Sequence, residues 1–219
     1  MASPLQNIPP VTRNLLYLNV LMYVATLINP SFMQDTFAMA FPLARDFRWW
    51  QPVTHMFMYG SFWHIFFNMY SLVMFGMIVE RVLGTRKFIW FYAITGLGAV
   101  LLHTGVEFLQ VQALLKEYPG MDPQSIYNSI PGVLGASGAV YGVLVAFAML
   151  YPEARLTLIF PPVTLDAKWW VLIFIGIELF TGITGTQMGI AHFAHLGGAL
   201  FGFLLIRYWR KAGTLYNGR

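Results

Sequence analysis

Long apolar stretches, interrupted by very few charges, constrain this chain more than any other feature. Of its 219 residues, 58% are hydrophobic and only 10% are charged, and the mean hydropathy of +0.61 is one that soluble globular domains rarely reach. A helix needs about 20 mainly apolar residues to span the hydrocarbon core of a bilayer, and several such runs fit between the charges. The sequence therefore predicts an all-α integral membrane protein.

The apolar runs predict six membrane-spanning helices in a single domain that covers residues 1–219. The expected helices span residues 13–29, 61–81, 87–107, 132–151, 168–186 and 190–209. An even number of crossings puts both termini on one side. With the termini in the cytoplasm, ten of the 13 Lys and Arg residues lie inside, and the exceptions are Arg45, Arg48 and Lys116. This distribution follows the positive-inside rule.

The connections between helices and the first residues add further expectations. Two outer connections are long, at 30–60 and 108–131, and the first is aromatic enough to be placed at the headgroup level. The first 14 residues lack the charged, apolar and small-residue regions of a secretory signal, so the first helix is expected to insert the chain.

Composition also excludes several kinds of chemistry. The chain has no Cys, so it forms no disulfide and has no thiol nucleophile. Its five His residues form no HExxH pattern, and no carboxylate pair shares a predicted depth, so no metal or organic cofactor is expected. No basic patch interleaved with aromatics indicates nucleic acid. Membrane lipid is the expected surrounding.

Polar side chains inside the predicted helices need an explanation, because a charge at the bilayer centre costs up to about 2.5–3.5 kcal/mol. Ser61 is the predicted N-cap of the second helix, which places His64 and Asn68 on one face of its first two turns. Ser137 and His195 lie about five residues into the fourth and sixth helices, roughly 7–8 Å below the outer surface. These four groups are therefore expected at a similar depth.

Small residues recur every four positions next to Ser137 and His195. They are Gly138 and Gly142 in the fourth predicted helix, and Ala194, Gly198 and Gly202 in the sixth. Such faces let two helices approach closely. If the two faces meet, Ser137 and His195 come within the hydrogen-bond distance that a nucleophile and its base require. Tyr141, one turn after Ser137, is expected to hold the ring of His195.

No acidic residue is predicted at the depth of His195, which favours a Ser/His pair over a Ser-His-Asp arrangement. Glu178 is predicted about 15 Å from the inner end of the fifth helix, deeper than the site. It is interpreted as a carboxyl group that is protonated or hydrogen-bonded to a neighbouring helix, and not as a third catalytic residue. The expected oxyanion donors are backbone N–H groups at the start of the fourth helix, including that of Ser137, together with His64 and Asn68.

Five motifs occur in order along almost the whole chain: WWQPVTHMF in the first loop, HIFFN at 64–68, VERVLG at 79–84, GASG at 135–138 and AHFAHLGG at 191–198. In this set the sequence resembles the rhomboid intramembrane serine proteases. The resemblance implies that Ser137 is the nucleophile, that His195 is the general base, that His64 and Asn68 bind the oxyanion, and that Tyr141 stacks on His195. The resemblance assigns no catalytic role to His192. Gly135 opens the GASG motif, and Gly198 closes the last one.

The resemblance also implies a substrate class. It implies cleavage of single-span membrane proteins within or near their transmembrane segment, with entry between the second and fifth helices and water reaching the site from the outer face. A bacterial inner membrane is the implied location, and an organellar membrane stays open. Two positions depart from the family pattern: Tyr59 stands where many bacterial members have His, and Gln51 where some members have Arg. Both are interpreted as affecting loop packing and substrate preference.

Structural alternatives remain for each of these features. Ser137 by itself is typical of a small residue at a helix contact, and His195 of a satisfied interior histidine. Glu80 and Arg81 are interpreted as charges that anchor a loop, and His55 and His103 as packing histidines.

Two other functions also remain open. One is a non-catalytic rhomboid-like protein that binds and escorts transmembrane segments. The other is a small transporter or channel with a polar path through His64, Asn68 and Glu178.

Overall fold

The computed structural model describes residues 7–158, 162–185 and 191–215, and helices make up most of them. The long helical segments are α1 (Pro10–Ile28), the continuous run of α4 (Phe62–Ser71), η3 (Leu72–Gly76) and α5 (Met77–Leu83), α6 (Thr85–Glu117), α8 (Ser137–Leu150), α9 (Ala167–Thr184) and α10 (His192–Lys211). Shorter elements connect them: α2 (Pro30–Phe37), α3 (Gln51–Thr54), η2 (His55–Phe57), α7 (Pro123–Ser129), and the antiparallel strands β1 (Arg155–Thr157) and β2 (Thr164–Asp166).

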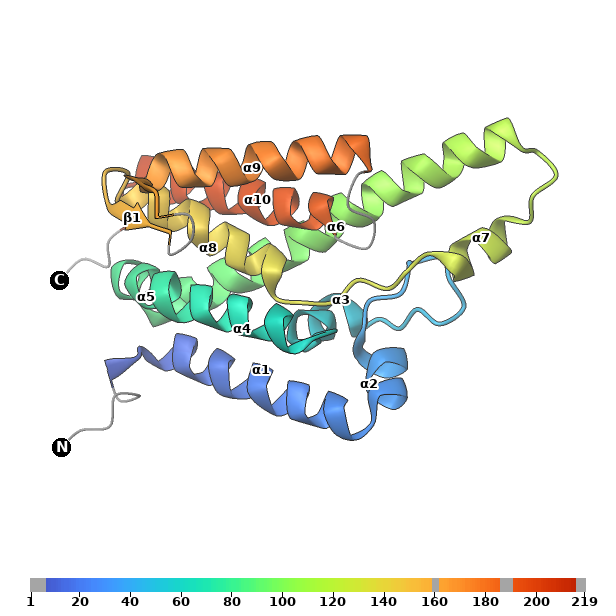
Figure 1. The fold of residues 1–219 in the computed structure, drawn as a ribbon, viewed down its shortest axis with the longest axis horizontal. Coiled ribbons are helices and arrows are strands. Elements are labelled where there is room, and N and C mark those ends of the chain that lie inside the picture. The colour runs from blue at the N-terminus through green and yellow to red at the C-terminus, as the bar shows by residue number, and fades with distance from the viewer. Residues whose placement is uncertain (1–6, 159–161, 186–190, 216–219) are drawn as a thin grey trace.

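The long segments lie side by side and alternate in direction, so that α1 begins and α10 ends at the same end of the bundle (Figure 1). Four of them, α1, α4–α5, α6 and α9, are long and apolar enough to cross a membrane, and α8 is a shorter apolar helix. The prediction of a mostly helical protein with several membrane helices is confirmed at this level. Crossings by α8 and α10 remain predictions.

Two helix starts show how side chains satisfy the exposed N–H groups of a first turn. The Glu80 carboxylate of α5 accepts hydrogen bonds from the backbone N–H groups of Val11 and Thr12, at 2.9 and 2.8 Å, and so caps α1. The predicted N-cap of the second span is also present, because Ser61 Oγ accepts from His64 N at 3.2 Å. Both caps supply acceptors that the first turn of a helix otherwise lacks.

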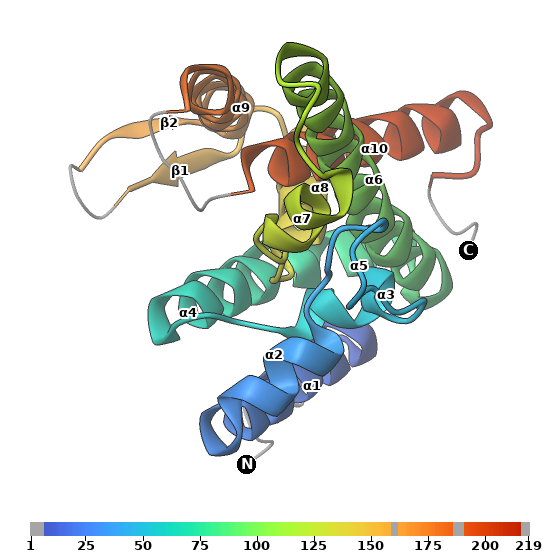
Figure 2. The ribbon, with the colours of Figure 1, turned by 90° about the vertical axis from the view of Figure 1, so that its right-hand side faces the viewer.

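Helix α8 lies at the centre of the bundle, where it contacts α4, α5, α6, α9 and α10 (Figure 2). Its closest neighbour is α10. A Cβ atom added to Gly198 would lie 1.8 Å from the carbonyl oxygen of Gly138, and one added to Gly202 would lie 2.8 Å from Cα of Gly142. The predicted contact between the two small-residue faces is therefore confirmed, and it brings the backbones of α8 and α10 together.

Two predicted boundaries are wrong. The third helix continues to Glu117 instead of ending at 107, because residues 108–117 contain no helix breaker before the Tyr118-Pro119-Gly120 sequence. The fourth helix begins at Ser137 instead of 132, because Val133 pairs with Met39 in a β-bridge, with both N–H···O distances at 2.9 Å. The predicted end of the fifth helix at 186 and the predicted start of the sixth helix at 190 lie outside the described residues.

Candidate active site

Ser137 is the first residue of α8, and a sharp turn delivers the chain to it. Gly135 makes this turn with φ +116°, a conformation that favours glycine, and its N–H donates to the carbonyl of His55 at 2.8 Å. A Cβ atom on Gly135 would lie 2.7 Å from Nε2 of His64. The expectation that Ser137 lies five residues into a helix is therefore wrong. The backbone N–H groups of Ser137 and Gly138 belong to the first turn of α8, where they have no acceptors within the helix.

His195 reaches Ser137 from the first turn of α10. Its Nε2 atom lies 2.8 Å from Ser137 Oγ, which is a normal hydrogen-bond distance. The ring of Tyr141 lies parallel to the imidazole, with a centroid distance of 4.5 Å and an interplanar angle of 5°. The structure thus brings together the hydroxyl, the imidazole and the aromatic ring that the sequence placed on facing helices.

The carboxylate of Glu178 lies on the other side of the same imidazole. Glu178 Oε1 is 2.8 Å from Nδ1 of His195 and accepts a hydrogen bond from the Tyr141 hydroxyl at 2.6 Å. Glu178 Oε2 is 2.6 Å from Nδ1 of His192. The expectation that no acidic residue lies at the depth of His195 is wrong, although Glu178 does bond to neighbouring helices as expected.

The sequence places Glu178 by its distance from the inner end of the fifth helix, but places Ser137 and His195 by their distance from the outer surface, so the two predicted depths were not directly comparable. Glu178 is six residues before Thr184, the last residue of α9, and so lies about 9 Å from that end. Only a short connection separates α9 from α10, so the 17-residue spacing between Glu178 and His195 was the signal in the sequence that these side chains share a level.

The two expected oxyanion donors come from α4, and the structure places them differently. The His64 ring lies against Gly135, two residues before Ser137, and packs edge-on against Tyr59 with a centroid distance of 5.2 Å. Asn68 is buried one turn further along, and its Nδ2 donates to the carbonyl of His64 at 2.8 Å. Among the described residues, Asn68 Oδ1 has no hydrogen-bond partner.

Comparison with known protein families assigns most of the chain to one family. Residues 46–212 match the family described as the rhomboid domain. The chain belongs to the rhomboid family.

Similar rhomboid proteins come from bacteria and eukaryotes. The chain is 35% identical over 153 residues to presenilin-associated rhomboid-like protein, mitochondrial, of Rattus norvegicus, covering 69% of this chain and 36% of the relative. It is 28% identical over 159 residues to rhomboid protease AarA of Providencia stuartii, covering 72% and 54%. It is 29% identical over 206 residues to rhomboid-related protein 4 of Homo sapiens, covering 91% and 58%. In each case the chain spans less than two thirds of the relative's length.

The two positions that the resemblance marked as departures from the family pattern, Tyr59 and Gln51, both form buried hydrogen bonds. The buried Tyr59 hydroxyl donates to Asn19 Oδ1 of α1 at 2.6 Å. Gln51 is also buried, and its Oε1 atom accepts from the backbone N–H of Arg48 at 3.0 Å. Sequence reasoning placed Gln51 and Tyr59 in loop packing but missed the link from Tyr59 to α1.

A small cavity of about 10 Å³ adjoins Ser137 in this rhomboid domain, and His55, Val133, Gly135 and Ala191 are among its lining residues. That volume is close to the minimum for one water molecule. His55 lies between the first two candidate spans, and burial lowers its pKa to about 4, so it is neutral at physiological pH. Among the described residues, no group of three or more His, Asp or Glu side chains is arranged to hold a metal ion.

Proposed function

We propose that this rhomboid protein is an intramembrane serine endopeptidase that cleaves transmembrane segments of single-span membrane proteins. The observation that carries the proposal is the 2.8 Å contact between Ser137 Oγ and His195 Nε2, the relation that an activated nucleophile has with its base. Similarity to a relative named as a rhomboid protease supports it. No cofactor is required for this chemistry.

The proposed reaction is ordinary peptide hydrolysis in two steps. His195 Nε2 takes the proton of Ser137 Oγ as the oxygen attacks the carbonyl carbon of the scissile bond. The C–N bond then breaks, His195 returns the proton to the leaving amine, and an acyl-enzyme ester remains on Ser137. Water attacks the ester while His195 takes its proton, and the proton passes back to Ser137 as the ester bond breaks.

The proposed oxyanion site lies at the start of α8. The backbone N–H groups of Ser137 and Gly138 point along the positive end of the helix dipole, which favours a developing negative charge. His64 is close enough to the turn at Gly135 to supply a side-chain donor. Asn68 has a second amide hydrogen besides the one that it donates to His64, and we assign that hydrogen to the oxyanion.

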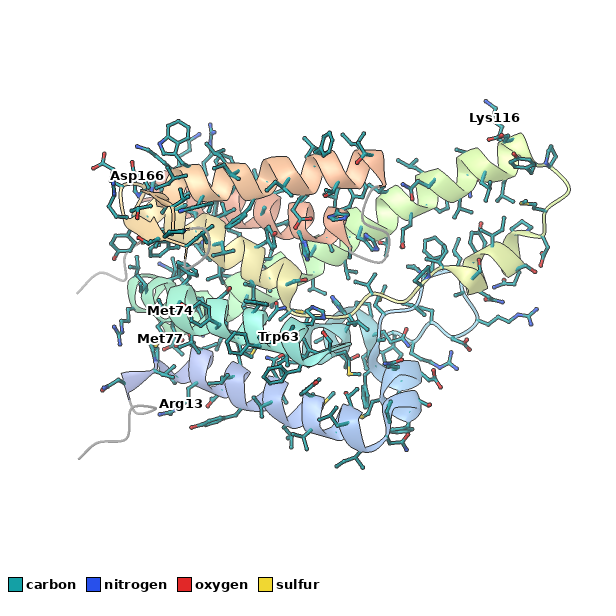
Figure 3. All side chains as sticks on the ribbon, viewed as in Figure 1. Arg13, Trp63, Met74, Met77, Lys116 and Asp166 are labelled. Atoms are coloured by element: carbon teal, nitrogen blue, oxygen red, sulfur yellow. The ribbon has the colours of Figure 1, made fainter. Side chains whose placement is uncertain are left out.

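The proposed membrane arrangement has six crossings with both termini in the cytoplasm. Arg13 and Asp166 lie at one end of the bundle and Lys116 at the other (Figure 3), so the basic end expected to face the cytoplasm is that of Arg13. Helices α4 and α9 lie on the same side of α8 (Figure 2), which supports lateral substrate entry between them. We propose a bacterial inner membrane, and an organellar membrane is the alternative.

The test is cleavage of a fluorescent transmembrane substrate in liposomes by the wild type, Ser137→Ala and His195→Ala. We expect turnover in the wild type and a loss of at least about 1,000-fold in each variant, with melting temperatures that show intact folding. Turnover that survives in Ser137→Ala would contradict the assigned nucleophile. A folded wild type that binds transmembrane peptides but cleaves none of a substrate panel would favour the binding and escort function.

A further inference from the structure

We propose that Glu178 is a positioning residue for the reaction. Its carboxylate holds His195 with the proton on Nδ1, so that the unprotonated Nε2 faces Ser137, and it stabilises the imidazolium that forms during proton transfer. This inference rests on the proposed function, and it replaces the Ser/His pair that the predicted depths favoured with an array of Ser137, His195 and Glu178.

The geometry around His195 sets the direction of each hydrogen bond. An ionised carboxylate only accepts hydrogen bonds, so the 2.8 Å contact with Glu178 Oε1 places a proton on Nδ1 of His195. A neutral imidazole carries one proton, and the bond at one nitrogen decides which tautomer is present. Nε2 is then the acceptor for the Ser137 hydroxyl at 2.8 Å. Without this partner, nothing in the contact with Ser137 selects the tautomer that can act as a base.

The carboxylate is itself held in place from two helices. Tyr141 of α8 donates to Oε1 at 2.6 Å, and His192 of α10 approaches Oε2 at 2.6 Å. Glu178 is buried, and a buried carboxylate stays ionised only if polar partners replace its lost hydration. Tyr141 therefore has two contacts with the site, because its ring stacks on His195 while its hydroxyl orients the carboxylate behind it.

The charged state of the array changes during the proposed reaction. When His195 takes the proton of Ser137, a positive charge appears next to the carboxylate of Glu178, and opposite charges at this distance attract strongly in a buried site. The polar groups that face Glu178 are Tyr141 from α8, His192 and His195 from α10, and Thr181 from its own helix, whose hydroxyl lies 3.1 Å from Nδ1 of His192. His192 thus orients Glu178 without contacting Ser137 in this arrangement.

The kinetic test is the split between kcat and KM for Glu178→Gln in liposomes. We expect kcat to fall by on the order of 100-fold or more, because the amide removes the charge that stabilises the imidazolium, while KM changes by less than about threefold. Glu107→Gln is the matched control, since Glu107 also pairs with a histidine, His103, at 3.1 Å, and it should keep wild-type kcat. A Glu178→Gln enzyme with kcat within about threefold of wild type would overturn the proposal.

A second measurement needs no substitution of Glu178. Nitrogen-15 NMR of histidine-labelled wild-type protein in detergent micelles reports which ring nitrogen of His195 carries the proton, with the signal assigned by its loss in His195→Gln. We expect the Nδ1–H tautomer, and an Nε2–H tautomer would overturn the positioning role even if Glu178→Gln fails to fold. The two proposals fail differently, because an error in the proposed function appears as cleavage that survives Ser137→Ala, whatever the tautomer.

Discussion

Gly198→Ala is predicted to separate the nucleophile from its base without changing either residue. The added methyl group would lie 1.8 Å from the carbonyl oxygen of Gly138 and 2.5 Å from its carbonyl carbon. Both atoms belong to the backbone of α8, so no side-chain rotation relieves the overlap. The two helices must move apart at the point where they are closest.

The size of this movement follows from the contact distances. Ordinary van der Waals contact for a Cβ atom begins at 3.4 Å, so the separation must grow from 1.8 Å by about 1.6 Å. If α8 and α10 move as rigid bodies, the Ser137···His195 distance of 2.8 Å grows to about 4.4 Å, too long for a hydrogen bond. Overpacking of this kind costs about 1–3 kcal/mol, and a misplacement of about 1 Å at a catalytic pair can lower kcat by about 100-fold.

The assay compares the melting temperature and substrate cleavage of Gly198→Ala with those of Gly176→Ala. Gly176 is the matched control, because it lies inside α9 and a Cβ atom there has no neighbour within 4 Å. Gly176→Ala should keep wild-type cleavage and gain up to about 1 kcal/mol from helix propensity. The prediction is refuted if Gly198→Ala has the same melting temperature as Gly176→Ala and cleaves substrate at a rate within about threefold of that control.

Three further predictions concern buried polar groups outside the reacting atoms. Tyr59→Phe removes the hydroxyl that donates to the buried Asn19 Oδ1, and should lower the free energy of unfolding by about 1–3 kcal/mol. A change below about 0.5 kcal/mol in chemical denaturation would contradict this. Glu80→Ala leaves the N–H groups at the start of α1 without their acceptor and should lower the free energy of unfolding by about 2–4 kcal/mol, with kcat unchanged in the folded protein. Steric trapping measures the stability and cleavage assays measure kcat, and an unchanged stability would refute the capping role. Burial lowers the pKa of His55 to about 4, against about 6.5 in an unfolded chain, so the unfolded state binds the proton first as the pH falls. The free energy of unfolding should therefore fall by up to about 3 kcal/mol between pH 6.5 and about 4. This decrease should be absent in His55→Gln when unfolding is measured against pH, and the same pH dependence in both proteins would contradict it.

The facing of α8 and α10 was predictable because it depends on local spacing. Small residues every four positions mark the close contact, and the structure places Gly198 against Gly138. The start of α8 was not predictable from hydropathy, because residues 132–136 are as apolar as a helix interior. The helix does not extend back to residue 132 because Val133 pairs with Met39, a residue that is far away in the sequence.

Glu178 was misplaced for a different reason. Its depth was counted from the inner end of the fifth helix, whereas the depth of His195 was counted from the outer surface, and α9 ends at Thr184, six residues after Glu178. The unusual presence of a carboxyl group in a spanning helix was the correct warning. Its partners could be found only when α8, α9 and α10 were packed together, since Tyr141, His192 and His195 come from two different helices.

The most direct test of the central claim is covalent labelling of the active serine. Purified protein in detergent is treated with a fluorophosphonate, and the modified residue is located by peptide mass spectrometry. The account predicts a single phosphonate on Ser137 in the wild type and in the control Ser129→Ala, whose hydroxyl bonds only within α7 in the described structure, and none on Ser137 in His195→Ala. Labelling of a different serine, or labelling of Ser137 at the wild-type rate without His195, would contradict it.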